Sequence, residues 1–194
     1  MRSDIVPGAI FPDYELSDHT AKHRRLSELQ GQHPMVLVLS RGGYCPKDRR
    51  QAEGLLELHR EMEVGYCRLV TISTDNITET NEYRSGVGAH WPFLSDTRRI
   101  VQKDLDIAEY TDPAHNLMIP HVIVLEPGLV IYKIYNGYWF FGRPTMEAPP
   151  GSAHGYQEMP AGLGHHNART QGGVGARPQG TFLSLRQNLR PNYR

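Results

Sequence analysis

The sequence contains little cysteine, no excess of either charge and no long apolar run. Its 194 residues include only Cys45 and Cys67, too few for a framework of disulfide bonds. Lysine plus arginine equals aspartate plus glutamate at 21 each, so no large basic field exists to hold nucleic acid or an anionic membrane surface. Apolar runs such as 35–39 are too short to span a bilayer, and the N-terminus shows no apolar leader. These absences predict a cytoplasmic protein without nucleic acid or membrane as a partner.

The apolar residues that are present fall into short runs. Runs rich in Val, Ile, Leu and Tyr predict buried strands at 35–40, 67–73, 120–126 and 129–135. Between the first two, 46–63 has apolar residues at helical spacing, which predicts a βαβ unit with a parallel strand pair. A second helix is expected after Asp75 or Asn76 and a third near 97–105. The turn at 126–129 (EPGL) joins the last two strands as an antiparallel hairpin.

The chain divides by composition into one domain and a tail. Residues 1–146 contain all the predicted strands, whereas 147–194 are rich in glycine and proline and mostly lack an apolar period. This composition predicts a flexible tail. A short helix at 181–190 is expected within it, because apolar residues share one helical face there behind a Thr181 cap.

Cys45 lies in LVLSRGGYCPKD (37–48), where an apolar run meets a glycine pair and a proline. Gly42 and Gly43 favour a tight turn from strand to helix, and Pro46 suits the first position of a helix. Unpaired amides at such a helix start stabilise an anion, so the Cys45 thiolate should form readily. Basic residues nearby add to this effect: Arg41, Lys47, Arg49 and Arg50. The pattern predicts an exposed, electropositive and reactive thiol; the alternative is a half-buried structural cysteine.

Several motifs along the chain match one known family. They are GAIFPDYELSD near the start, VTISTDNITET and WPFLSD in the middle, and MIPHVIVLEPGLVIYKIYNG and FGRPT near the end. Over residues 6–146 the chain resembles the thioredoxin fold as used by the peroxiredoxin-like, alkyl hydroperoxide reductase/thiol-specific antioxidant (redoxin) family. The resemblance implies an α/β, thioredoxin-like fold, with a central mixed sheet flanked by helices and a Gly/Pro-rich C-terminal extension.

The resemblance also implies a site around Cys45. The family's peroxidatic motif, Pro-x-x-x-Thr-x-x-Cys, places Arg41, Cys45 and Asp48 at its three fixed positions, so an aspartate stands where the peroxidatic cysteine is expected. What remains is similar to a Cys-Pro-x-Cys arrangement that has lost its second thiol, with Cys45 as the attacking sulfur. Gly43, Tyr44 and Pro46 complete this turn. Pro120 matches the strand-leading proline that faces the active cysteine in this fold, where it is cis; on sequence alone, a trans proline at the edge of a strand is the default.

The implied function is thiol-dependent redox chemistry by one cysteine. Cys45 would reduce a peroxide or exchange a disulfide, with an external thiol reductant of the thioredoxin or glutathione type. A carboxylate at Asp48 cannot attack peroxide, and 118–135 holds no arginine, only His121 and Lys133 as polar choices. The alternative function is therefore a redox-inactive binding module with a thioredoxin fold.

Other candidate sites carry less chemistry. Cys67 opens a strand that should be buried on both faces, so a structural role is expected. His154, His165 and His166 lie in the tail, where no rigid shell would hold a metal, and neither a metal nor a cofactor is predicted. Residues 136–142 (NGYWFFG) are expected to pack internally, with the edge of a homodimer as the alternative.

Overall fold

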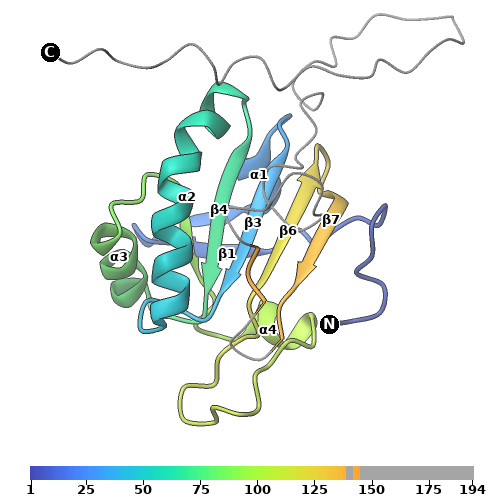
Figure 1. Ribbon diagram of the computed structural model, residues 1–194. Helices are drawn as coiled ribbons and strands as arrows, with labels where there is room; N and C mark the ends of the chain where they lie inside the picture. Colours follow the sequence, from blue (N-terminus) through green and yellow to red (C-terminus); the bar gives the residue numbers. More distant parts are fainter. Residues whose placement is uncertain (139–141, 145–194) are drawn as a thin grey trace, which may run out of the picture.

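A computed structural model describes residues 1–138 and 142–144 of the chain. Within these residues a seven-stranded mixed sheet has the strand order β2-β1-β5-β4-β3-β6-β7. The strands are β1 (Glu15–Asp18), β2 (His23–Arg25), β3 (Met35–Ser40), β4 (Arg68–Ser73), β5 (Phe93–Ser95), β6 (His121–Glu126) and β7 (Val130–Asn136). The helices are α1 (Leu26–Gln30), α2 (Pro46–Val64), α3 (Ile77–Gly86) and α4 (Ile100–Asp104), and Figure 1 shows their arrangement.

The central strands pair as the sequence predicts. β3 and β4 are parallel and joined by α2, which confirms the βαβ unit. β6 and β7 are antiparallel and are joined by a tight turn, which confirms the hairpin. All six residues of β3 are buried, as expected for a strand covered on both faces. The expected fold class, a mixed sheet flanked by helices, is therefore the observed one.

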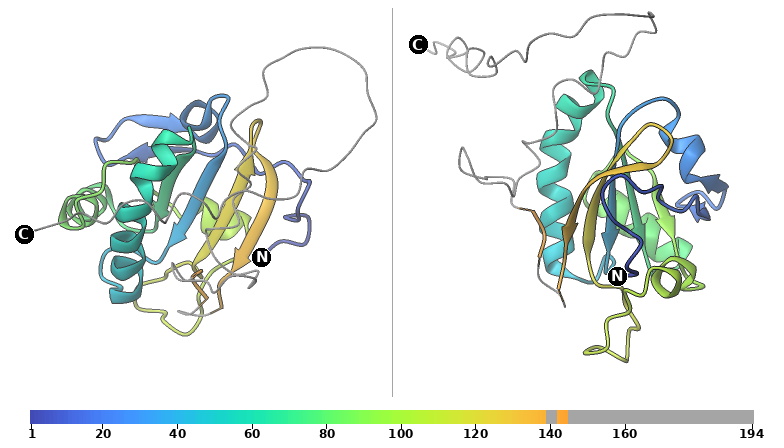
Figure 2. Two further views of the ribbon diagram at one scale, coloured as in Figure 1. Left: turned by 45° about the horizontal axis from the view of Figure 1, so that its top comes forward. Right: turned by 90° about the vertical axis from the view of Figure 1, so that its right-hand side faces the viewer.

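Helices cover both faces of the sheet. One core cluster joins sheet residues to α2 and α3 through side chains such as Leu55 and Tyr83. The other cluster lies on the opposite face and includes Leu26 of α1 and Val101 of α4. The edge-on view in Figure 2 shows α2 on one side of the sheet and α1 and α4 on the other. The carboxyl ends of β3 and β4 thus lie at one edge of a sheet packed on both faces.

Local sequence explains where the helices near this edge begin. Pro46 opens α2, with Cys45 as its N-cap residue. Asn76 caps α3: its side chain accepts a hydrogen bond from the Glu79 amide, while the Glu79 carboxylate accepts one from the Asn76 amide. Of the two caps considered for this helix, Asn76 is the observed one.

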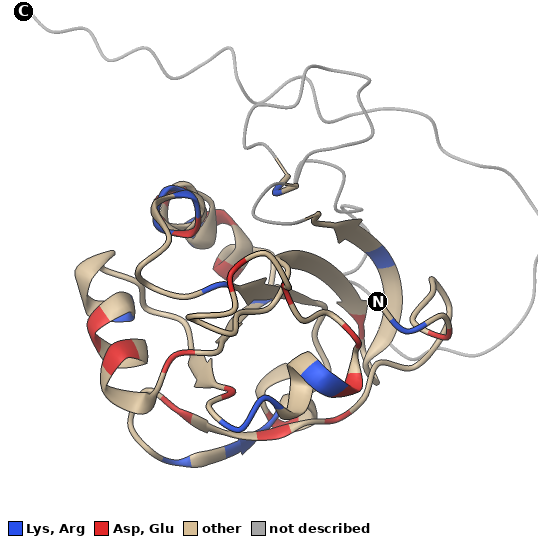
Figure 3. Cartoon of the chain, turned by 90° about the horizontal axis from the view of Figure 1, so that it is seen from below, with Lys and Arg blue, Asp and Glu red and all other residues tan. Residues whose placement is uncertain are grey.

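The described surface carries no dominant charge. Acidic and basic residues are interspersed along the described chain (Figure 3). Among the described residues, no helix combines the length and hydropathy needed to cross a membrane. The expected tail (147–194), with its helix at 181–190 and its three histidines, lies outside the described residues.

Candidate functional site

The turn between β3 and α2 is built around two glycines. Gly42 has φ +114°, which favours glycine, and a Cβ there would overlap the Asp75 carboxylate. A Cβ on Gly43 would lie 2.8 Å from the Cβ of Tyr83. The Gly43 amide donates a hydrogen bond to Asp75 Oδ2 (2.8 Å), and burial raises the pKa of this carboxyl group. The glycine pair thus lets the turn pack directly against the end of β4 and against α3.

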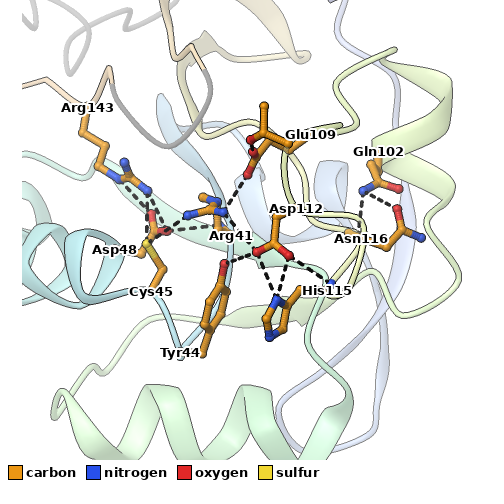
Figure 4. Close-up of polar contacts among 11 residues, drawn as sticks. Arg41, Tyr44, Cys45, Asp48, Gln102, Glu109, Asp112, His115, Asn116 and Arg143 are labelled. Carbon is orange, nitrogen blue, oxygen red and sulfur yellow. Dashed lines mark hydrogen bonds and ion pairs between the residues drawn. The ribbon is translucent and has the colours of Figure 1, made fainter.

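The Cys45 sulfur lies between two arginine side chains. Nη1 of Arg41 and Nη2 of Arg143 each lie 3.7 Å from Sγ (Figure 4). Cys45 is only 2% exposed, so the expectation of an exposed sulfur is wrong. The sulfur also accepts no capping hydrogen bond at the start of α2. Its positive surroundings come from the two guanidinium groups, one of which belongs to Arg143, beyond the end of β7.

Asp48 shares the Arg143 guanidinium with this sulfur. Arg143 Nε and Nη2 donate to the two carboxylate oxygens of Asp48 at 2.9 and 2.7 Å, a bidentate pair. The Arg41 amide also donates to Asp48 Oδ2 (3.2 Å). Asp48 is 1% exposed. The position expected for a peroxidatic thiolate therefore holds a buried anion that cannot be oxidised in the same way.

Arg41 is held by a second set of carboxylates. Its Nη2 lies 2.6 Å from Glu109 Oε2 and 3.6 Å from Asp112 Oδ2. Glu109 is 3% exposed and accepts a short hydrogen bond from the Thr111 hydroxyl. Each guanidinium beside the sulfur is therefore also paired with a buried carboxylate.

Tyr44 and His115 form the outer side of the site. Their rings stack at 4.7 Å, and the Tyr44 hydroxyl donates to Asp112 Oδ2 (3.2 Å). His115 Nδ1 lies 2.9 Å from Asp112 Oδ1, and this hydrogen bond lowers the pKa of the Asp112 carboxyl group. Burial raises the pKa of Tyr44 to about 12, so its hydroxyl remains protonated at neutral pH.

Of the four basic residues near Cys45 in sequence, the structure brings Arg41 to the sulfur. Arg49 instead donates from Nε to the Gly43 carbonyl (2.5 Å), and its guanidinium lies over the Tyr83 ring. Lys47 and Arg50 are exposed on α2. Pro46 occupies the first turn of that helix, as expected.

Pro120 is buried immediately before β6, at the edge of the sheet where β3 ends. The expected cis peptide is wrong: the described residues contain no cis peptide bond. The Ile119 amide donates to the Ile107 carbonyl (2.7 Å), and His121 Nδ1 lies 2.8 Å from the Ile119 carbonyl. X-Pro bonds generally prefer the trans isomer.

The residues that sequence reasoning missed come from distant segments. Arg143 lies in the FGRPT motif, which was recognised as family-like but not assigned to the site. Glu109 and Asp112 lie in the irregular segment before β6, where no periodicity or motif marks them. Of the polar choices considered in place of an arginine, His121 is buried at the start of β6 and Lys133 lies over the Tyr135 ring.

Comparison with known sequences identifies the family of this chain. The model of the AhpC/TSA family matches residues 7–134, which is more than half of the chain. The chain belongs to the AhpC/TSA family. A search of curated protein sequences finds no significant match.

Solved structures place this AhpC/TSA member among thioredoxin-like folds. Peroxidoxin BcpB from Mycobacterium tuberculosis is 23% identical, with a TM-score of 0.61 over 68% of this chain and 85% of that chain. Xylella fastidiosa PrxQ is 17% identical, with a TM-score of 0.60 over 70% and 87%. A yeast mitochondrial 1-Cys peroxiredoxin is 14% identical, with a TM-score of 0.62 over 72% and 70%. At these identities the likeness is evidence for the fold.

Proposed function

We propose that this chain is a thiol-dependent redox protein in which Cys45 is the reacting group. The observation that carries the proposal is the position of Sγ, 3.7 Å from the guanidinium groups of both Arg41 and Arg143. Positive charge beside a sulfur favours the thiolate, which is the nucleophile in peroxide reduction and in disulfide exchange. Membership of the AhpC/TSA family supports the same chemistry.

The reaction with a peroxide starts at the sulfur. The Cys45 thiolate attacks the terminal oxygen of ROOH, the O–O bond breaks, and the sulfur becomes a sulfenic acid while RO⁻ takes a proton and leaves as ROH. An external thiol then attacks the sulfenic sulfur, which releases water and forms a mixed disulfide. A second external thiol restores Cys45 and leaves as the oxidised disulfide. Two electrons pass from two thiols to one peroxide.

The burial of Cys45 limits which oxidants can react in this closed arrangement. With 2% exposure the sulfur offers little surface to a bulky reagent, and the side chain of Arg143 is itself largely buried against the site. Small hydroperoxides fit this arrangement better than protein disulfides do. The buried sulfur must become accessible before the external reductant can reach it.

Peroxide consumption tests the proposal directly. Cys67→Ser serves as the background, so that Cys45 is the sole cysteine, and hydrogen peroxide loss is followed with dithiothreitol, glutathione or thioredoxin as reductant. Consumption that Cys45→Ser abolishes and Arg143→Gln slows is the expected result. Equal consumption by the Cys45→Ser variant would refute the proposal.

A redox-inactive binding module remains the second candidate, because one observation favours it. Asp48, Glu109 and Asp112 already compensate the two guanidinium charges, which weakens their pull on a thiolate. Iodoacetamide alkylation of the same Cys67→Ser background separates the candidates. A rate no faster than that of Cys45 in the urea-unfolded chain, with no sulfenic acid trapped by dimedone after peroxide, would select the binding module.

A further inference from the structure

A cavity lies next to the Cys45 turn, beyond the carboxyl ends of β3 and β4. Its volume is about 420 Å³, and its walls include Gly43 and Tyr44 from the turn, Glu82 from α3, and His115. This volume lies within the range of small-molecule sites. In open α/β sheets, ligands characteristically bind outside the carboxyl ends of the parallel strands. We call this cavity the Arg49 pocket, after the guanidinium in its wall.

Two cations line the Arg49 pocket without a carboxylate partner. Arg49 donates from Nε to the Gly43 carbonyl, and no ion pair involves its guanidinium among the described residues. Within the described residues, Arg99 donates hydrogen bonds to main-chain carbonyls, including those of Thr74 (2.6 Å) and Asn116 (2.8 Å). Neutral carbonyls fix the Arg99 guanidinium, and the nearby Asp96 carboxyl group offsets only part of its charge. The pocket therefore holds two positive charges to which a ligand carboxylate can bind.

Three acidic residues also line the Arg49 pocket: Asp75, Glu79 and Glu82. Glu82 is exposed on α3 and, within the described part of the chain, has no ion-pair partner. Glu79 lies one helical turn earlier and uses one carboxylate oxygen to cap α3. The stacked rings of Tyr44 and His115 also line the pocket. The buried Thr74 hydroxyl, in a residue that also lines the pocket, lacks a hydrogen-bond partner among the described residues.

We propose that the Arg49 pocket binds a small molecule that carries both a carboxylate and an ammonium group, and that this molecule is the external thiol reductant. The carboxylate binds the guanidinium groups of Arg49 and Arg99, and the ammonium group binds Glu82. Glutathione and related amino-acid thiols have this chemistry. The second half of the proposal rests on the proposed function of Cys45.

The pocket lies within reach of the reacting sulfur. Gly43 and Tyr44 directly precede Cys45, so the Cα atoms of Gly43 and Cys45 are at most about 7 Å apart. An extended tripeptide spans roughly 10 Å. A thiol anchored in the pocket is therefore long enough to extend over Tyr44 to the turn. Once the buried sulfur of Cys45 becomes accessible, this thiol attacks the sulfenic sulfur and forms the mixed disulfide with loss of water.

Binding is tested without redox chemistry. The Cys45→Ser variant is titrated with S-methylglutathione, which has no free thiol, by isothermal calorimetry and by NMR. We expect a dissociation constant on the order of 1 mM. Arg49→Gln should weaken binding about tenfold, because one charge-assisted contact is lost. Glu82→Gln, which lies away from the turn, should weaken it several-fold. Matched controls on the exposed face of α2, Arg60→Gln and Glu57→Gln, should leave it unchanged.

The outcomes separate the pocket assignment, the reductant role and the proposed function of Cys45. No binding, or binding that neither Arg49→Gln nor Glu82→Gln weakens, would overturn the pocket assignment. Should dithiothreitol still support peroxide turnover through Cys45 in that case, the proposed function would stand alone. Pocket binding of S-methylglutathione without turnover under any reductant would leave a ligand site and overturn the reductant role. Glutathione turnover whose KM does not rise in Glu82→Gln would also overturn that role.

Discussion

In the proposed function, the reactivity of Cys45 would depend on how two guanidinium charges are shared. Arg143 contacts both the sulfur and Asp48, and Arg41 contacts both the sulfur and Glu109. A charge pair about 4 Å apart interacts by about 4 kcal/mol at an effective dielectric constant of 20. Each guanidinium therefore interacts with its carboxylate at least as strongly as with a thiolate on Cys45. The carboxylates, and not the arginines alone, set how readily the thiolate forms.

Asp48→Asn tests this balance at one residue. The substitution keeps the size of the side chain but removes its charge, so the Arg143 guanidinium is left to the sulfur. Alkylation of Cys45 near pH 7 should become about tenfold faster, which corresponds to about 1.4 kcal/mol. Rates are measured with iodoacetamide in the Cys67→Ser background, with the exposed Asp106→Asn as the control. A slower rate in Asp48→Asn would show that the carboxylate mainly positions Arg143.

Cys67 should behave in the opposite way. Burial raises the pKa of its thiol to about 11, so almost none of it is thiolate at neutral pH. In the Cys45→Ser variant, we expect alkylation of folded protein to be negligible near pH 7 and to become fast only on unfolding. Mass spectrometry of the alkylated chain, with and without urea, measures this. Rapid labelling of the folded chain at Cys67 would contradict the burial argument.

The sequence predicts only the part of the site whose residues lie close together along the chain. Cys45, Arg41 and Asp48 are local, so a turn and a helix start were enough to group them. Glu109 and Arg143 approach from segments about 60 and 100 positions later, and only the fold brings them to the turn. The expectation of an exposed Cys45 sulfur was wrong for the same reason, because Arg143, which contacts the sulfur, is remote in sequence.

Individual elements were predictable where one signal dominated. The apolar runs marked β3 and β6 almost to the residue, because strands covered on both faces consist mainly of apolar side chains. α4 was expected near 97–105 but spans Ile100–Asp104. Arg99 precedes it with a left-handed φ of +60°, and the Asp96 carboxylate accepts hydrogen bonds from the amides of Ile100 and Gln102. This local conformation has no periodic signal in the sequence.

The β3–α2 turn should not tolerate a side chain at Gly42. Gly42→Ala places a Cβ at a φ of +114° and against the Asp75 carboxylate, so both strain and overlap act. We expect the free energy of unfolding to fall by about 3 kcal/mol, measured by urea denaturation. Gly65→Ala at the end of α2 is the matched control, because Gly65 has a φ of −80° and ordinary contacts there. Equal losses in the two variants would show that the turn tolerates a side chain.

At the scale of the whole molecule, the sheet places a titratable group in the middle of the fold. His121 opens β6, where it pairs with Leu39 of β3 and Asn136 of β7, and it is 4% exposed. Its Nδ1 lies 2.8 Å from the Ile119 carbonyl, which suits a neutral ring with the proton on Nδ1. Burial disfavours the charged ring and lowers the pKa of His121 to about 4.

Acid stability should therefore depend on this residue. The unfolded chain protonates His121 near pH 6.5, whereas the folded chain does so only near pH 4. Its contribution to stability is complete above about pH 6.5 and is lost as the pH falls toward 4, because only the unfolded state gains a proton in that interval. The loss is on the order of 3 kcal/mol. Urea denaturation at several pH values should show that His121→Gln removes this part of the pH dependence and that exposed His23→Gln keeps it. Parallel pH curves for the wild type and His121→Gln would mean that the ring is protonated in the folded sheet.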